Sequence, residues 1–452
     1  MPRALLPLLL VLVLAPVVLA QDEVERERPQ NVILLIADGF GPASATLARE
    51  FSGEPLALDG ILRGAVRTAS TSSRVTDSAA GATAFASGVR TYNGAIGVDS
   101  LQHPVGTVLE AAQAQGMKTG LVATSRITHA TPATFAAHVP ERWDEATIAE
   151  HMAARDIDVV FGGGRKHFVP EAAGGARTDG RDLVDEVRER GTTVITDRDG
   201  FDRATDTPVL GLFADDHLAY EIDRDETDQP SLATMTQRAL DLLDGTDEGF
   251  FLMVEGSRID HAGHSNDPAA HVHDVLAYDA AVRAALDFAR ADGRTLVVSV
   301  ADHETGGLSL GRDGVYAWHP EDLARVTASA DRMREMIEAG AEPREVVRAH
   351  AGLNEMTPEE VARLGTADEP PSTLTLGHLV SERAALGWTT TGHTGIDVQL
   401  YAFGPGSEPL RGVLTNDAVG RIIADALGLD LAPVTDELRE ALRPAEPAES
   451  GE

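Results

Sequence analysis

Three apolar runs of this sequence end in a carboxylate, and histidines follow two of them. Asp38 closes the run 31–38, Glu255 closes a second and Asp302 a third. In open α/β sheets, the carboxyl ends of the strands form the edge where ligands bind. One carboxylate at such a place could equally cap the helix that follows. Three of them together favour a metal site.

Histidines near these carboxylates extend the candidate ligand set. Asp260 and His264 are four residues apart, so on a helical turn they face the same way. Asp302 is followed directly by His303. Oxygen and nitrogen ligands without sulfur suit zinc in a catalytic site rather than a structural one. His393 stands between two glycines, and that motif alone indicates only a surface loop.

Ser78 is the candidate nucleophile. Residues 75–84 predict a helix of small residues with Thr76 or Asp77 as its N-cap and Ser78 in its first turn. A helix N-terminus offers unpaired N–H groups and a positive dipole end, which favour an alkoxide and a bound phosphate. Alternatively, Ser78 could do no more than cap the helix. A histidine–aspartate pair or a metal ion can activate serine, and the ligands above offer the metal route.

The elements that would position these residues alternate between strands and helices. Continuous apolar runs predict buried parallel strands. Alternation of such strands with helices predicts an α/β fold, a three-layer sandwich with a central, mainly parallel sheet. Strands are predicted at 31–38, 118–124, 157–161, 249–255 and 294–302, and helices at 107–115, 231–243 and 274–291.

Residues 311–385 depart from this alternation and are interpreted as an insertion above the sheet. A polar-faced helix is predicted over 323–340. Thr357, Pro358 and Glu360 form a helix-start signature. The three glycines at 162–164 predict a loop with unusual backbone angles, and a phosphate cradle is the alternative.

The composition excludes several classes of function. The chain has 452 residues, of which 43% are hydrophobic, so it can fill a large core. Its 72 acidic and 38 basic residues give a net charge of −34, which argues against nucleic acid as a partner, because a phosphate backbone needs a basic surface. The absence of cysteine excludes disulfides, thiolate metal sites and a cysteine nucleophile.

The first residues predict export. Arg3 precedes an apolar run over 5–18, and Val18 and Ala20 are small residues suited to signal peptidase before Gln21. The run is short and interrupted by proline, which favours cleavage over a membrane anchor. We expect a signal peptide (1–20), a linker (21–30), a main domain (31–430) and a polar C-terminal tail (431–452), with a periplasmic or extracellular location and no anchor after cleavage.

Seven motifs, in order along the chain, resemble those of the alkaline phosphatases, a family of metal-dependent phosphomonoesterases. The resemblance runs from residue 31 to about residue 427. The motifs are Asp38-Gly39, the segment 76–80 around Ser78, and the segments 128–132, 161–166, 249–261, 301–303 and 391–395.

The resemblance implies a role for each candidate residue. Ser78 would be the nucleophile that is phosphorylated, and Arg142 would bind the phosphate with its fork of donors. Two zinc ions and one magnesium ion per subunit are implied. The implied ligands are Asp260, His264 and His393 for the first zinc; Asp38, Asp302 and His303, with Ser78, for the second; and Asp38, Thr131 and Glu255 for magnesium.

Two histidines beside these ligands depart from the best-known bacterial pattern. His129 stands where that branch has an aspartate near magnesium, and His261 stands where it has a lysine. Histidine at both places resembles animal and some marine enzymes, and it predicts looser magnesium binding. In the segment 211–232, Ala214 and Gln229 replace two acidic ligands of the calcium that animal enzymes carry, so we expect no calcium there.

The implied reaction is hydrolysis of phosphate monoesters to an alcohol and inorganic phosphate through a phosphoserine intermediate. The resemblance also implies a homodimer with a crown-like insertion at 311–385 near its interface. One alternative is a related phosphodiesterase, sulfatase or phosphonate hydrolase, and another is a non-catalytic binder of metal or phosphate. Thr131, Glu255 and Arg142 favour monoesters, the absence of cysteine disfavours a sulfatase, and Ser78 at a helix start disfavours a mere binder.

Overall fold

The computed structural model describes residues 28–441. The predicted signal peptide, most of the predicted linker and residues 442–452 lie outside the described residues. Within 28–441, no helix is both long enough and apolar enough to cross a membrane.

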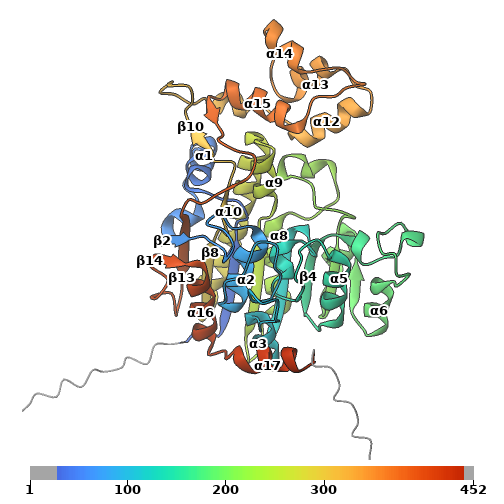
Figure 1. Cartoon of the computed structure of the whole chain (residues 1–452), viewed down its shortest axis with the longest axis vertical. Helices are drawn as coiled ribbons and strands as arrows, with labels where there is room; N and C mark the ends of the chain where they lie inside the picture. Colours follow the sequence, from blue (N-terminus) through green and yellow to red (C-terminus); the bar gives the residue numbers. More distant parts are fainter. Residues whose placement is uncertain (1–27, 442–452) are drawn as a thin grey trace, which may run out of the picture.

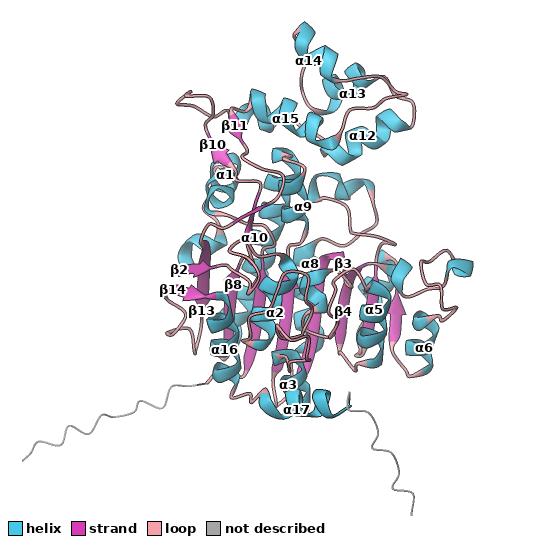
Figure 2. Cartoon of the chain, viewed as in Figure 1, coloured by secondary structure: helices cyan, strands magenta, loops and turns pink. Residues whose placement is uncertain are grey.

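A ten-stranded sheet forms the centre of the molecule (Figure 2), with the strand order β14-β2-β13-β8-β1-β7-β3-β4-β6-β5. β13 runs antiparallel to both of its neighbours, and the other neighbouring strands pair in parallel. The predicted mainly parallel sheet is therefore confirmed. Its strands are β1 (Asn31–Ile36), β2 (Leu62–Arg67), β3 (Lys118–Arg126), β4 (Val159–Gly163), β5 (Thr193–Ile195), β6 (Val209–Leu212), β7 (Phe250–Glu255), β8 (Thr295–Val300), β13 (Val398–Phe403) and β14 (Gly412–Thr415).

Helices cover both faces of the sheet, as the three-layer prediction requires (Figure 1). α8 and α10 pack together on one face, and α2 and α16 pack together on the other. The helices outside the insertion are α1 (Pro42–Ser52), α2 (Ser78–Ser87), α3 (Val108–Ala114), α4 (Ala130–Ala133), α5 (Glu145–Ala154), α6 (Leu183–Glu189), α7 (Arg198–Arg203), α8 (Leu232–Leu243), α9 (Arg258–His264), α10 (Pro268–Asp292), α16 (Asn416–Leu427) and α17 (Ala432–Ala441), with short 3-10 helices η1 (Ala57–Ile61), η2 (Arg165–His167), η3 (Glu171–Ala173) and η4 (Glu221–Glu226).

Local sequence signals explain where the main elements begin. All six residues of β1 are buried, as its continuous apolar run predicts for a central strand. The side chain of Asn31 accepts a hydrogen bond from N–H of Phe250 and donates to Thr295 Oγ1, so it ties together the starts of three neighbouring strands. Asp267 caps α10 by accepting from two backbone N–H groups, and Pro268 follows at the first helical position.

The insertion lies beyond the carboxyl end of the sheet (Figure 1). It contains α11 (Pro320–Leu323), α12 (Ala330–Glu338), α13 (Pro343–His350), α14 (Pro358–Arg363) and α15 (Thr373–Arg383), and β10 (Ser309–Leu310) pairs with β11 (Leu386–Gly387) at its base. The single helix predicted over 323–340 is wrong. The chain breaks there because Ser329 caps α12, and two carboxylates of the main body, Asp223 and Asp267, accept from N–H of Ser329 and Ala330.

The predicted polar tail begins with a helix that the sequence did not reveal. α17 lies at the end of the molecule opposite the insertion (Figure 1). Thr435 Oγ1 accepts from N–H of Gly106, and Arg439 pairs with Asp99 at 2.8 Å. Contacts with distant residues, rather than an apolar pattern, hold this helix in place.

Candidate metal centre

The three strand-end carboxylates meet at the carboxyl edge of the sheet, as predicted. β1 lies between β7 and β8, and Ile36 is in register with Glu255 on one side and with Val300 on the other. Asp38 and Asp302 follow two residues beyond their strands. All three carboxylates are completely buried.

A first ligand set consists of Asp260, His264 and His393, whose ligand atoms lie within 4.8 Å of one another. Nε2 of His264 is 3.3 Å from Asp260 Oδ2, and Nε2 of His393 is 3.5 Å from Asp260 Oδ1. α9 supplies the first two residues. β12 (His393–Thr394) supplies the third, because it pairs with β9 (Glu304–Thr305) directly after Asp302 and His303.

Backbone carbonyls orient both imidazoles of this set. Nδ1 of His264 donates to the carbonyl of Thr391 at 2.5 Å, and Nδ1 of His393 donates to that of Thr76 at 2.9 Å. Each Nε2 therefore faces Asp260, an arrangement typical of metal-binding histidines. The two Nε2 atoms are 3.2 Å apart, a separation that fits two ligands of one cation and that the proton of His264 bridges in the metal-free protein. Burial lowers the pKa of His264, but the hydrogen bond and the charge of Asp260 outweigh burial and raise this pKa to about 9.

A second ligand set lies beside Ser78. Asp38, Asp302 and His303 offer ligand atoms within 4.8 Å of one another. Nε2 of His303 is 3.6 Å from Asp38 Oδ1, 3.4 Å from Asp302 Oδ2 and 3.3 Å from Oγ of Ser78. Nε2 of His303 therefore lies close both to the proposed nucleophile and to the two carboxylates of the second set.

A third ligand set combines Asp38, His129 and Glu255. The resemblance assigned Thr131 to this set and placed His129 beside it, whereas the structure brings a ligand atom of His129 itself within 4.8 Å of the two carboxylates. Thr131, two residues after His129 on α4, is completely buried. Burial raises the pKa of Glu255 to about 7, and hydrogen bonds from Ser257 and other neighbours partly oppose that rise.

The buried polar atoms of these sets lack the partners that buried groups normally have. Burial, together with repulsion from the neighbouring carboxylates, raises the pKa values of Asp38 and Asp302 well above their ordinary range. Converging, unpaired carboxylates with raised pKa values fit divalent cations. Within residues 28–441, the atoms without a hydrogen-bond partner include both carboxylate oxygens of Asp38, Asp302 Oδ2, Glu255 Oε1, Thr131 Oγ1 and His129 Nδ1.

Asp77 and small residues set the position of Ser78. Asp77 is the N-cap of α2, where its side chain accepts from N–H of Ala80 at 3.0 Å. A Cβ atom on Gly81 would lie 3.1 Å from Cβ of Asp302, so α2 packs directly against the edge of the sheet. Gly39 has a φ of +78°, and a Cβ there would meet Cα of Asp260 at 2.6 Å. Glycine at position 81 lets α2 lie close to Asp302, and glycine at position 39 lets α9 lie close to the end of β1.

Arg142 joins the same constellation. Its Nη1 donates to Asp77 Oδ2 at 3.0 Å, and its Nη2 donates to Nε2 of His129 at 3.1 Å. Burial and the nearby charge of Arg142 hold the pKa of His129 well below its ordinary value, so the imidazole is neutral. The guanidinium is therefore fixed between the cap of α2 and the third ligand set.

A histidine cluster outside the predicted ligands adjoins the third set. The ring of His261 lies 5.4 Å from that of His129 and 4.4 Å from that of His217. His217 contacts Arg126 through both of its ring nitrogens. The sequence carried no signal for His217, because it stands in a loop between acidic and apolar residues without a recognisable motif.

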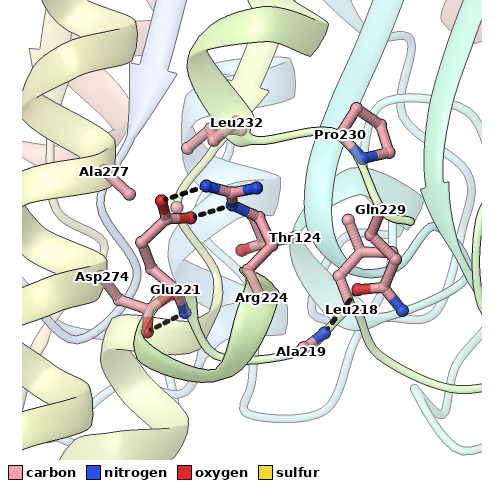
Figure 3. A pocket seen from close by; sticks show the side chains of 11 residues that line it. Thr124, Leu218, Ala219, Glu221, Arg224, Gln229, Pro230, Leu232, Asp274 and Ala277 are labelled. Carbon is pink, nitrogen blue, oxygen red and sulfur yellow. Dashed lines mark hydrogen bonds and ion pairs between the residues drawn. The ribbon is translucent and has the colours of Figure 1, made fainter. Parts of the chain in front are cut away.

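The segment around Gln229 is held by hydrogen bonds within the chain (Figure 3). Oε1 of Gln229 accepts from N–H of Ala219 at 2.8 Å, and Asp274 on α10 accepts from N–H of Glu221 at 3.2 Å. Gln229, at one of the two positions where an acidic calcium ligand was expected to be replaced, thus binds the loop backbone directly.

The fold agrees with comparisons to known proteins. A family model described as alkaline phosphatase matches residues 29–429. The chain belongs to the alkaline phosphatase family. Members of this family are metal-dependent phosphomonoesterases, so the chain is an enzyme of that class, and the ligand sets above occupy its candidate metal centre.

Individual relatives cover most of the chain. The repressible alkaline phosphatase of Saccharomyces cerevisiae is 41% identical over 91% of this chain and 84% of its own. The cold-active alkaline phosphatase of a Shewanella species has a TM-score of 0.81 and 36% identity, over 88% of this chain and 99% of its own. A variant of the alkaline phosphatase of the Antarctic bacterium TAB5, with a histidine replaced by aspartate and Mg bound in its M3 site, has a TM-score of 0.68 and 30% identity, over 90% of this chain and 99% of its own.

Proposed function

We propose that this enzyme hydrolyses phosphate monoesters through a phosphoserine at Ser78, with two zinc ions and one magnesium ion. The observation that carries the proposal is the position of Oγ of Ser78, 3.3 Å from Nε2 of His303 at the start of α2. When bound, the metals supply Lewis-acid chemistry that lowers the pKa of an oxygen ligand and offsets negative charge on the phosphoryl group.

The donor atoms of each set fit the proposed metals. The two sets that contain Asp260, His264 and His393, or Asp38, Asp302 and His303, combine imidazole with carboxylate, which suits zinc. The third set, Asp38, His129 and Glu255, has the same donor types as the second, two carboxylates and one imidazole. The buried, unpaired hydroxyl of Thr131 adds an oxygen donor near it, which favours magnesium.

Ser78 performs the first step on the phosphoryl group. Its Oγ loses its proton and forms a bond to phosphorus, while the bond between phosphorus and the alcohol oxygen breaks and the leaving alkoxide takes up a proton. Water then attacks the phosphoserine, the bond from phosphorus to Oγ breaks, and inorganic phosphate leaves. The N-terminus of α2 stabilises negative charge on Oγ and on the phosphoryl oxygens.

Arg142 orients the phosphoryl group in both steps. A guanidinium can bind two phosphate oxygens at once. The hydrogen bond to Asp77 fixes the plane of this guanidinium before substrate arrives, so less conformational freedom is lost on binding.

His129 is the reason why the third set should bind magnesium only weakly. A neutral imidazole adds no negative charge to the third set, and magnesium prefers hard oxygen ligands. The TAB5 variant with aspartate in place of a histidine contains Mg in its M3 site, and we assign His129 to the equivalent role. Excess zinc should therefore compete at this set.

The alternatives require a different site. A diester would have to place its second alcohol where Arg142 and the third set hold the free phosphate oxygens. Binding of a metal or of phosphate without catalysis would not require a fully buried serine whose Oγ adjoins a proposed metal ligand.

The test measures turnover and metal content on one sample. We expect rapid hydrolysis of p-nitrophenyl phosphate, slow hydrolysis of its bis-ester, two zinc ions and one magnesium ion per chain, and loss of activity on chelation. Ser78→Ala should lose several orders of magnitude in turnover and should no longer be labelled by radioactive phosphate at acidic pH. A label on another residue would disprove the assignment of the nucleophile.

We also propose an exported homodimer. Val315 and Tyr316, exposed at 54% and 105%, lie on the first loop of the insertion, before α11, which suits a partner surface there. Light scattering should give twice the mass of the mature chain, and a monomer at micromolar concentration would reject the dimer. N-terminal sequencing of the exported protein should begin at Gln21, whereas a retained N-terminus would reject the signal peptide.

A further inference from the structure

The side chain of Arg258, at the start of α9, contacts three different parts of the chain. Its Cζ lies 3.6 Å from the centre of the Tyr220 ring, and its Nη1 lies 3.0 Å from Nδ1 of His261. Nη2 lies 4.0 Å from Asp331 Oδ2 on α12 of the insertion. The guanidinium is thus placed between the main body, the insertion and the histidine that adjoins the third ligand set.

The contact with Arg258 determines which nitrogen of His261 carries the proton. Arginine is always charged and only donates, so Nδ1 of His261 must accept. A neutral imidazole that accepts at Nδ1 carries its proton on Nε2. No residue within 28–441 forms a hydrogen bond with that Nε2, and His261 is only half-buried.

The free Nε2–H belongs to the same neighbourhood as the proposed phosphate ligand. The ring of His261 lies 5.4 Å from that of His129, and His129 contacts Arg142 directly. From these contacts we infer that Arg258 is a positioning residue, which fixes His261 as a hydrogen-bond donor toward bound phosphate. The inference deepens the proposed function and rests on it.

An adjacent cavity explains why Arg258 needs its other two contacts. The cavity has a volume of about 280 Å³ and is lined by Tyr220, Arg258, Asp331 and mostly charged neighbours. Without a fixed partner, the guanidinium could turn into this polar space and leave Nδ1 of His261. The face of Tyr220 attracts the cation, and Asp331 attracts it from the insertion.

The two supports of Arg258 are themselves anchored. Hydrogen bonds of Gln229 and Asp274 fix the segment that carries Tyr220 (Figure 3). N–H of Ala330, next to Asp331, donates to the buried Asp267 of the main body at 2.7 Å. The position of the insertion on the main body therefore affects, through Asp331 and Arg258, which tautomer His261 adopts.

The experiment combines Arg258→Met with histidine-selective ¹⁵N NMR on the metal-loaded enzyme. The signal of His261 is assigned by its loss in His261→Ala. In the parent enzyme we expect the shifts of an Nε2–H imidazole, and in Arg258→Met a mixture of both tautomers. The inhibition constant of inorganic phosphate should rise about tenfold, the loss expected for one hydrogen bond to a charged group, with metal content unchanged.

Two further variants test the route through His261. In the His261→Ala background, Arg258→Met should cause no additional loss of phosphate affinity. An undiminished loss there, or an unchanged tautomer in Arg258→Met, would overturn the inference. Arg332→Met is the matched control, because Arg332 lines the same cavity but pairs with Glu226; both the tautomer and the phosphate constant should stay at parent values.

Asp331→Ala provides a second approach should Arg258→Met fail to fold. The side chain of Asp331 is 43% exposed, so its loss carries little risk to folding. We expect a two- to threefold weaker phosphate affinity and partial loss of the Nε2–H tautomer, and no change in either would overturn the inference. The tautomer is measured without turnover, so failure of the proposed function, seen as unimpaired activity of Ser78→Ala, is distinguishable from failure of this inference.

Discussion

Nη2 of Arg142 donates to Nε2 of His129 at 3.1 Å, so the proposed phosphate ligand and the third ligand set are in direct contact. The other terminal nitrogen of Arg142 donates to Asp77, the N-cap of the helix that begins with Ser78. Nucleophile, phosphate ligand and third set are therefore joined through one guanidinium. A change at any of them is expected to alter phosphate binding as well as its own function.

Arg142→Lys tests the forked contact. Lysine keeps the charge but cannot bond Asp77 and two phosphate oxygens in one plane. We expect KM and the inhibition constant of phosphate to rise on the order of 10- to 100-fold, which corresponds to one or two charged hydrogen bonds, while zinc content stays the same. Equal phosphate affinity in the two enzymes would exclude Arg142 as the phosphate ligand. Steady-state kinetics and elemental analysis give both quantities.

Zinc uptake by the metal-free protein should depend on the protonation of His264. The pKa of His264 is raised to about 9 by Asp260, so the imidazole is protonated at neutral pH and must lose its proton when zinc binds. Affinity at this set should rise by about tenfold per pH unit between pH 7.5 and 9 and level off above that. Competition with a chelator of known affinity measures this slope.

The same shift has a consequence for the stability of the metal-free protein. The folded pKa of His264 is above its unfolded value, so its ion pair with Asp260 stabilises the fold fully below pH 6.5 and is lost as the pH rises through about 9. His103→Ala serves as the control for both measurements, because the side chain of His103 is 59% exposed and lies outside the ligand sets. A zinc affinity that is flat across this pH range would contradict the role of His264.

Gly39→Ala should damage the first ligand set from a distance. Gly39 has a φ of +78°, which alanine tolerates poorly, and the new Cβ would lie 2.6 Å from Cα of Asp260. We expect α9 to shift, one zinc ion to bind more weakly by tenfold or more, and thermal stability to fall. Gly53→Ala is the control, since Gly53 has a similar φ of +70° but open space around its Cβ position. Equal zinc affinity in the two variants would show that the close approach is unimportant.

The strand-end carboxylates could be predicted from the sequence because parallel strands place their carboxyl ends at one edge. Asp38, Glu255 and Asp302 follow from that rule alone. The spacing of Asp260 and His264 likewise needed only a helical turn. Prediction went furthest where a ligand is fixed by the strand or helix on which it stands.

Other parts of the site depend on contacts between distant segments. His393 stands in a glycine-flanked loop, and only the two-residue pairing of β12 with β9 brings it to Asp260. Thr131, His129 and Arg142 were placed through the family resemblance, not through local pattern. His217 was missed as a neighbour of His261, since a contact between histidines of distant segments leaves no periodic signal. Arg258 was missed although its spacing of three residues on α9 places it on the same face as His261. The break between α11 and α12 was missed because it depends on Asp223 and Asp267, more than 60 residues away.

His129→Asp tests the reason for loose magnesium binding. Aspartate supplies negative charge and a hard oxygen ligand or water anchor, so the third set should bind magnesium more tightly, by roughly the 10- to 100-fold typical of changes around metal ligands. Inhibition by excess zinc should diminish at the same time, because the imidazole that favours zinc is gone. The measurement is a magnesium titration of activity in metal-free enzyme reloaded with two zinc ions.

The direct contact with Arg142 adds a second effect to this variant. Aspartate would pair with the guanidinium and would draw it away from bound phosphate, so the inhibition constant of phosphate should rise. His129→Asn separates the two effects, because asparagine offers an oxygen ligand without the charge and should leave magnesium affinity closer to that of the parent. The same half-saturating magnesium in the parent and His129→Asp would remove His129 from the third set and leave the other two sets unaffected.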